Sequence, residues 1–296
     1  MIAPVAAQRV LRGVTATINV TFADQNGEPA AAAGTVTVDV TKADGTAVVT
    51  GGTTSAGTGT GAFTYSLAAQ ANLELLTVVW KDNGAARLTT LVEVVGGYYF
   101  TVAEARAFDN KITLELATDA KIIAVRREVE DECERITGCA WVPRYRLKRY
   151  DPGWGQGRLL LDDWAPRAIR SVKQYSSATQ FVAYTNAELA AVSFTEWGQL
   201  TRRDGQAWWG TPGGTVVEYE YGYDAPPPDL KHACLTRLRS RLYMEKTGIP
   251  DRATSFTSVE GGTFAIATPG QGVWETGLPE VDAVYARYCV KSPGIA

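Results

Sequence analysis

The chain has 296 residues, of which 45% are hydrophobic and 21% charged, and its formal net charge is −3. This composition excludes a disordered or collagen-like chain, and no run of about 18 apolar residues predicts a membrane-spanning helix. The N-terminal MIAPVAAQRVLRG has no basic segment followed by an apolar core, so no secretory signal is expected. A charge this close to neutral excludes capture of nucleic acid by the whole surface and leaves only a local basic patch for DNA.

Charge is distributed unevenly along the sequence. The first 97 residues are rich in Thr, Val, Ala and Gly and hold only 12 of the 61 charged side chains. A chain of this length is long enough for two domains. We therefore expect a domain boundary at Gly96-Gly97.

Residues 1–97 are predicted to form a β-sandwich. Every second residue from Val14 to Phe22 is apolar, the period of a half-buried strand, and Asn83-Gly84 is a hairpin-turn dipeptide. Short strands separated by turns, with no helical pattern among them, indicate an immunoglobulin-like architecture without its cysteine pair. The predicted strands are residues 14–22, 35–45, 62–67, 75–84 and 86–95.

The Gly- and Thr-rich stretch at residues 51–62 lacks the lysine and following helix of a phosphate-binding loop, so we interpret it as a flexible loop between strands. The glycines at residues 153–157 have the spacing of a dinucleotide loop, but Pro152 precedes them and no helix follows. They are interpreted as a turn.

A long amphipathic helix is predicted at residues 118–138. Its apolar residues have helical spacing and form a narrow stripe, its outer face is heavily charged, and Gly138 is a typical C-cap. Shortly before it, Thr101 and Glu104 have the spacing of a capping box, which starts a first short helix.

A β-rich insertion is expected from about residue 144 to 223, with Gly, Pro and Asp-Gly turns between its strands. In its last strand, Tyr219 and Tyr221 share a face with Val217. The predicted strands are residues 145–150, 157–162, 168–176, 181–185, 197–205 and 215–223.

A second long helix is predicted at residues 227–248. Prolines precede it and Pro228 fits its first turn, because proline has no amide hydrogen to leave unpaired there. Residues 251–296 form a predicted C-terminal arm that becomes ordered on a partner and carries a short helix at 278–290. The fold class is therefore predicted as α+β with two domains: the sandwich at 1–97, then a helical domain at 98–250 with its β-rich insertion, and the extended arm.

Residues suited to catalysis or metal binding are few. The chain has four cysteines without a CxxC pair and a single histidine, His232, so neither a zinc site nor a histidine-dependent nucleophile is predicted. Asp162-Asp163 and the acidic run from Glu128 to Glu134 could pair carboxylates, but we assign them to a turn and to a solvated helix face. No cofactor is expected.

Two basic clusters are the candidates for contact with DNA phosphates, because neighbouring side chains of a strand or helix can present several cations together. Pairing with the acidic helix or with another subunit is the competing interpretation. The clusters are Arg144, Arg146, Lys148 and Arg149 in the insertion, and Arg237, Arg239 and Arg241 in the second helix.

Three features in this order resemble the head-to-tail adaptor, or connector, proteins of tailed bacteriophages. They are the leucine-rich LLLDDWAPRAIRSVKQY, the tryptophan pair after an Asp-Gly turn in RRDGQAWWG, and the junction EYEYGYDAPPPDLKHACLTRLRSRL. The resemblance covers about residues 98–250, and it rests on the order of elements. The N-terminal sandwich departs from the family pattern, which leaves the role of this domain open.

The resemblance implies a non-enzymatic virion protein that forms a ring, commonly of twelve subunits, between the portal and a tail-side stopper or tail terminator protein. Viral DNA then passes through the ring without sequence-specific binding, and the protein is located in the neck after assembly in the host cytoplasm. The family's C-terminal segments typically embrace the portal. Here the residues assigned to that role are Phe264, Trp274, Val281, Val284, Tyr285 and Tyr288.

A competing hypothesis is that the sandwich binds carbohydrate or another molecule of a host surface, with the rest of the chain as its mount. Such a site needs exposed aromatic side chains. Only Phe22, Phe63, Tyr65 and Trp80 are available in this part of the sequence. A third hypothesis, a small hydrolase, lacks the convergent histidines or metal ligands that it requires.

Overall fold

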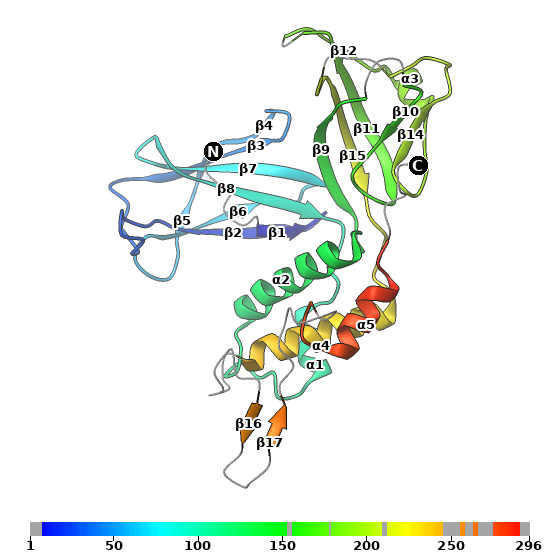
Figure 1. Ribbon diagram of the computed structural model, residues 1–296. Coiled ribbons are helices and arrows are strands. Elements are labelled where there is room, and N and C mark those ends of the chain that lie inside the picture. Colours follow the sequence, from blue (N-terminus) through cyan, green and yellow to red (C-terminus); the bar gives the residue numbers. More distant parts are fainter. Residues whose placement is uncertain are drawn as a thin grey trace. The chain divides into compact units, whose positions relative to one another are not determined.

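The computed structural model is a mixed α+β protein whose described residues are 8–152, 156–177, 179–208, 212–244, 255–257, 263–265 and 275–290. Two compact units each combine separate stretches of sequence (Figure 1). The strand-rich unit consists of Met1–Gly97 and Val142–Asp224, and the helical unit consists of Tyr98–Trp141 and Ala225–Ala296. The predicted division into domains at 1–97, 98–250 and 251–296 stays a prediction.

Two sheets form the N-terminal part of the strand-rich unit. The five-stranded sheet has the order β1-β8-β7-β3-β4, with β1 parallel to β8, and the three-stranded sheet has the order β2-β6-β5. The strands are β1 (Gln8–Leu11), β2 (Ala16–Thr21), β3 (Val36–Lys42), β4 (Ala47–Thr53), β5 (Ser55–Ala56), β6 (Ala62–Leu67), β7 (Glu74–Asp82) and β8 (Ala85–Val95).

One apolar core lies between these two sheets. Ile18 and Phe22 from the β2 side meet Val38 and Val78 of the larger sheet, because alternate side chains of each strand point inward. Trp80 is also fully buried in this core and donates its Nε1 hydrogen to Thr90 Oγ1 at 3.0 Å. The immunoglobulin-like assignment of this arrangement stays a prediction.

The predicted hairpin between residues 75–84 and 86–95 is confirmed. β7 and β8 pair antiparallel, and Asn83 and Gly84 have φ values of 50° and 83°, which suits the two-residue turn that the dipeptide favours. The loop predicted at residues 51–62 is wrong in part, because Gly51 to Thr53 belong to β4 and Ser55–Ala56 form β5. Glycine and threonine there obscured a strand pattern.

The second part of the strand-rich unit, residues 142–224, is the β-rich insertion. Its four-stranded sheet has the order β12-β11-β15-β9 and its three-stranded sheet the order β10-β14-β13. Its elements are β9 (Arg144–Tyr150), β10 (Arg158–Leu160), β11 (Pro166–Tyr175), β12 (Phe181–Ala183), α3 (Asn186–Ala190), β13 (Val192–Phe194), β14 (Gln199–Arg202) and β15 (Thr215–Tyr221).

Alternation along β15 follows the sequence pattern. Val217 and Tyr219 are fully buried and Tyr221 nearly so, whereas Glu218 and Glu220 on the opposite face are partly exposed. The short helix α3 was not predicted.

The helical unit contains α1 (Val102–Phe108), α2 (Asp119–Thr137), α4 (Pro228–Met244) and α5 (Pro279–Arg287), together with the paired strands β16 (Ser255–Thr257) and β17 (Thr263–Ala265). α4 packs against α1, α2 and α5, and α5 also contacts α2. The predicted helix at 227–248 is confirmed through Met244, and its last four residues lie outside the described part. No helix among the described residues has the length and apolar run that crossing a membrane requires.

Candidate functional site

Helix α2 begins and ends where its sequence predicts. Thr118 is the N-cap and accepts a hydrogen bond from the Lys121 amide, and Gly138 ends the helix in the left-handed conformation. The stripe that includes Ile122, Val129 and Cys133 is completely buried. This burial fixes the orientation of the charged face.

The acidic run of α2 was assigned to a solvated face, which is correct for only part of it. The side chains of Glu128 and Asp131 remain 59% and 48% exposed, but Glu130 is completely buried and Glu132 is only 10% exposed. Glu130 accepts a hydrogen bond from the Tyr99 amide at 3.0 Å. Two carboxylates of the run therefore stabilise the fold of the helical unit itself.

Helix α4 supplies the cations that face these carboxylates. Arg237 donates from Nε and Nη2 to the two carboxylate oxygens of Glu132 at 2.9 and 3.0 Å, and its Nη1 donates to the Thr276 carbonyl at 2.9 Å. Arg241 pairs with Glu128 at 2.6 Å and with Glu132 at 3.3 Å. A bidentate, almost fully buried pair has the geometry in which an ion pair is strongest.

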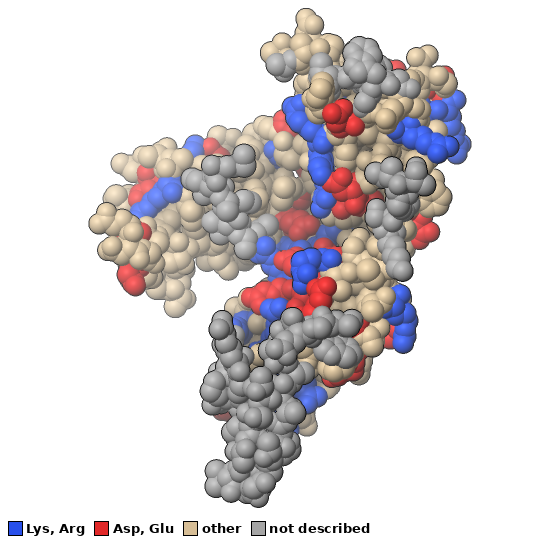
Figure 2. All heavy atoms as spheres, viewed as in Figure 1, with Lys and Arg blue, Asp and Glu red and all other residues tan. Residues whose placement is uncertain are grey.

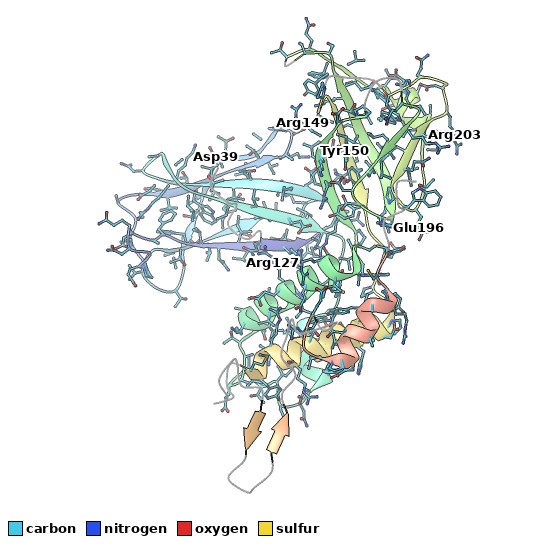
Figure 3. All side chains as sticks on the ribbon, in the orientation of Figure 1. Asp39, Arg127, Arg149, Tyr150, Glu196 and Arg203 are labelled. Atoms are coloured by element: carbon cyan, nitrogen blue, oxygen red, sulfur yellow. The ribbon has the colours of Figure 1, made fainter. Side chains whose placement is uncertain are left out.

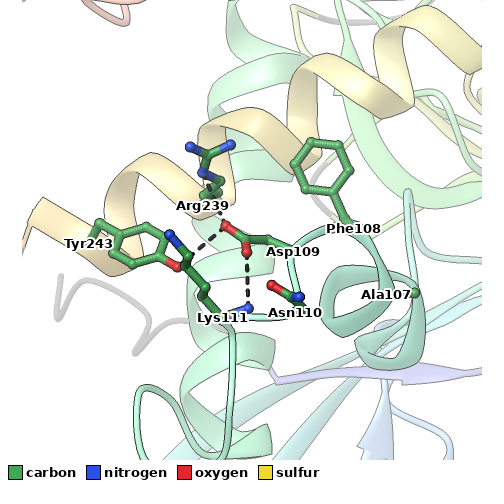
Figure 4. A pocket seen from close by; sticks show the side chains of 7 residues that line it. All are labelled: Ala107, Phe108, Asp109, Asn110, Lys111, Arg239 and Tyr243. Atoms are coloured by element: carbon green, nitrogen blue, oxygen red, sulfur yellow. Dashed lines mark hydrogen bonds and ion pairs between the residues drawn. The ribbon is translucent and has the colours of Figure 1, made fainter.

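The third cation predicted in α4, Arg239, lies at the surface. Its side chain is 54% exposed and its Nε is 3.2 Å from Asp109 Oδ2. Figure 4 shows this pair at the wall of a pocket of about 660 Å³, where Tyr243 also donates to Asp109 at 3.3 Å. Asp109 thus engages both of the α4 side chains at this open, polar pocket. Arg239, the cation that α4 contributes to the pocket, is therefore already paired.

The interior of the helical unit holds two thiols and a phenol. Cys133 of α2 and Cys234 of α4 lie beside each other, and the Cys234 sulfur is 3.6 Å from the Tyr285 hydroxyl of α5. Burial raises the pKa of Cys133, and burial together with the neighbouring thiols raises that of Tyr285. Cys133 and Tyr285 therefore keep their protons and contribute packing and not nucleophilic chemistry.

Four residues assigned to portal binding lie in or next to α5. Val281 and Tyr285 are completely buried within the helical unit, whereas Val284 and Tyr288 are partly exposed. The Tyr288 hydroxyl donates to Asp229 at 2.7 Å. A portal contact made by α5 in this position uses its outer face, and the assignment stays a prediction.

For the remaining two residues assigned to portal binding, the structure describes the backbone of one. Phe264 lies in β17, which pairs with β16. Trp274 lies outside the described residues.

The basic cluster of the insertion divides between the two faces of β9. Arg144 is 1% exposed and lies 3.7 Å from Glu93, and Arg146 lies 3.1 Å from Asp163. Lys148 pairs with Asp162. Arg149, on the opposite face, makes no ion pair among the described residues and stacks on the Tyr175 ring.

A buried hydrogen-bonded chain surrounds Asp163. Tyr219 donates to Asp163 at 2.5 Å, and the hydroxyls of Tyr150 and Tyr219 are 2.7 Å apart. Burial raises the pKa of Asp163 against the opposing effect of Arg146, and burial raises the pKa of Tyr150 to about 12. This series of hydrogen bonds links β9 and β15 to the turn that contains Asp162 and Asp163.

The other residues considered for a site are the single histidine and the aromatic residues of the sandwich. His232 is exposed on α4 and packs edge-on against Phe108. No cluster of three or more His, Cys, Asp or Glu side chains in the described part of the chain could hold a metal ion. In the sandwich, Phe22 and Trp80 are buried in the core, and Phe63 and Tyr65 pack against it.

No protein-family model matches the chain, and no curated protein matches it. Solved chains similar to it come from structures described as the neck of an empty GTA particle with C6 symmetry, the virion of a native gene transfer agent (GTA) particle, and the neck of a native GTA particle with C12 symmetry. Their identities are 17%, 16% and 15%, and their TM-scores are 0.42, 0.44 and 0.41. The matches cover 66%, 66% and 68% of this chain and 92%, 92% and 98% of the others. At these values the likeness concerns the course of the backbone and assigns no function.

Proposed function

We propose that the chain is a structural, non-enzymatic protein of a virion neck: a head-to-tail adaptor that forms a ring between portal and tail and surrounds the path of the DNA. The proposal rests first on the sequence resemblance of residues 98–250, whose helices and strands occur in the expected order. In this proposal the ring has twelve subunits, binds the portal on one side and a stopper or tail terminator protein on the other, and touches DNA without reading its sequence.

The observation that carries the proposal is the way α2 and α4 are joined. They come from sequence on either side of the insertion, yet the buried pair of Arg237 and Glu132 and the adjoining apolar stripes hold them together. Helices joined in this way form a closely packed unit that can be repeated around a ring.

Exposed apolar side chains of the helical unit give such a ring its contacts. Leu114 is 69% exposed, Met244 50% and Ile123 45%. When a neighbouring subunit covers apolar side chains of this size, their removal from water favours association.

Electron microscopy and mass measurement of the purified full-length chain, alone and mixed with its portal, test the proposal. We expect closed rings, seen end-on, with a mass that is a constant multiple of 31.9 kDa. A chain that remains monomeric at every concentration and does not associate with portal contradicts it.

A further inference from the structure

The ten basic side chains of the insertion fall into two groups. Six are in ion pairs: Arg144, Arg146, Lys148, Arg167, Arg170 and Arg202. The other four, Arg149, Arg158, Lys173 and Arg203, make no ion pair in the part of the chain that the structure describes. An unpaired cation is available to an anionic partner, whereas a paired one must first leave its carboxylate.

Two of these four cations lie together on one face of the four-stranded sheet. Val216 of β15 is directly opposite Arg149 of β9 on one side and Lys173 of β11 on the other, so the three side chains share a row across the sheet. Two strand spacings separate the two cations, which is roughly 10 Å between their Cα atoms. Figure 3 labels Arg149 on β9, and Figure 2 shows basic side chains gathered over this strand.

Two aromatic rings on the same face hold these cations. The Arg149 guanidinium lies 4.8 Å from the centre of the Tyr175 ring, and the Lys173 ammonium lies 5.4 Å from that of Phe181. The two rings are themselves 5.1 Å apart. Phe181 is 47% exposed. We name this set, Arg149, Lys173, Tyr175 and Phe181, the sheet-end cluster.

The carboxylates of the same sheet face are already engaged. Glu220 pairs with Arg170, and Glu218 accepts hydrogen bonds from Tyr145 and Ser171. Both lie farther along β15 than Val216, toward Tyr221. The nearby carboxylate outside this sheet is Asp44, in the turn after β3, whose pKa is lowered first by hydrogen bonds from Thr46 and also by the charges of Lys42 and Lys173. No carboxylate among the described residues forms an ion pair with Arg149 or Lys173, so two cations of the sheet face remain for an anionic partner.

We propose that the sheet-end cluster binds the phosphate backbone of double-stranded DNA. Long basic side chains whose Cα atoms are roughly 10 Å apart can each reach a phosphate of the same DNA strand. The aromatic rings limit the motion of the cations in advance and so reduce the entropy lost on binding. With two phosphate contacts for each chain and no contact to base edges, the binding is weak and independent of sequence.

Fluorescence anisotropy with a short labelled duplex of mixed sequence tests this, with the full-length protein titrated at several salt concentrations. In Arg149→Glu/Lys173→Glu we expect the affinity to fall by about tenfold or more, and the slope of log K against log salt to become shallower by about 2. The matched control is Arg12→Glu/Lys111→Glu, which changes the net charge equally at two exposed cations outside the insertion. Its affinity and slope should stay close to those of the wild type.

The proposal is overturned if the wild type does not bind DNA, if the control variant loses affinity equally, or if the salt slope of the cluster variant is unchanged. A circular dichroism spectrum and unfolding midpoint like those of the wild type show that the cluster variant is folded. A cluster variant that binds DNA normally but no longer assembles assigns the cluster to a protein contact and also overturns it.

The inference rests on the proposed function only for the source of the DNA. Mass measurement of the same samples distinguishes failure of the DNA contact from failure of the adaptor role. If the wild type binds DNA through the cluster but never forms rings, the adaptor role fails and the DNA contact stands. If rings form but the cluster variant binds DNA as the wild type does, the contact fails and the adaptor role stands.

Discussion

At the scale of single residues, the arginines of α4 have different roles despite their equal charge. The side chain of Arg237 is 9% exposed and binds Glu132 through two hydrogen bonds, whereas that of Arg239 is 54% exposed beside Asp109. Removing one member of a buried pair costs about 3–5 kcal/mol when the other charge is left uncompensated. Arg241 remains 3.3 Å from Glu132, so the lower end of this range applies. We expect Arg237→Leu to lower the free energy of unfolding by an amount in this range, measured by urea denaturation.

The matched control for that substitution is Arg239→Leu. Because water and salt screen an exposed ion pair, its loss should cost less than about 1 kcal/mol. Equal losses in the two variants would show that the buried pair is not what joins α2 to α4.

Tyr150 gives a prediction about alkaline pH. Burial raises its pKa from 10.0 to about 12, so the folded protein keeps this proton after the unfolded chain has released it. The free energy of unfolding is unaffected by the titration of this group below pH 10. It decreases as the pH rises through about 12, by a total of about 2–3 kcal/mol. The free energy of unfolding of Tyr150→Phe, subtracted from that of the wild type, should therefore be constant up to about pH 10 and fall above it. A difference that is flat across the alkaline range would contradict the burial of this hydroxyl.

At the scale of elements, the end of α2 depends on one backbone conformation. Gly138 has a φ of 72°, and a Cβ atom there would lie 3.3 Å from Val290 Cγ2. Gly138→Ala should therefore lower the free energy of unfolding by about 1–2 kcal/mol. Gly157→Ala is the control, because a Cβ at Gly157 meets nothing within 4 Å; its effect should be within about 0.5 kcal/mol. Denaturant titration of both variants decides the comparison.

The elements that the sequence could predict are those with a long pattern or a strong end signal. α2 has both, and the capping box of Thr101 and Glu104 is present as expected. β4 was missed because its Gly and Thr residues carry no period-two pattern. The helix α3 and the strand β13 are five and three residues long, too short for a periodic signal, although Thr185 and Glu188 form a capping box that could have located α3.

The candidate sites were less predictable than the elements, because the role of a cation depends on its partner. Arg146 and Arg149 look alike in the sequence, yet Arg146 is paired with Asp163, whereas Arg149 makes no ion pair within the described ranges and lies over the Tyr175 ring. That distinction follows from the alternation of β9 and from strands far away in sequence. Lys173, Tyr175 and Phe181 were not singled out at all, although the alternation of the predicted strand at 168–176 already places Lys173 and Tyr175 on one face.

At the scale of the whole molecule, each unit is made from two separate stretches of chain, so the division does not follow the sequence. Residues 98–141 complete their core only when α4 and α5 return to them, after the insertion has been synthesised. Contacts between such distant residues make folding slow and cooperative. A fragment that ends before α4 should therefore leave the buried stripe of α2 exposed.

The surface of the helical unit supplies the last prediction, which concerns assembly. Leu114 and Ile123 lie just before α2 and in its first turns, and both are exposed. If a neighbouring subunit covers them, each contributes about 1.5–3 kcal/mol to association, and a glutamate in its place adds the cost of a desolvated charge. We expect Leu114→Glu/Ile123→Glu to raise the protein concentration needed for ring formation by about tenfold or more, measured by mass photometry. The control, Val14→Glu/Leu160→Glu, changes two apolar residues of the strand-rich unit that are 50% and 46% exposed, and it should assemble like the wild type. Normal rings from the first variant would place the subunit interface elsewhere, whereas rings lost in both would point to a general effect of added negative charge.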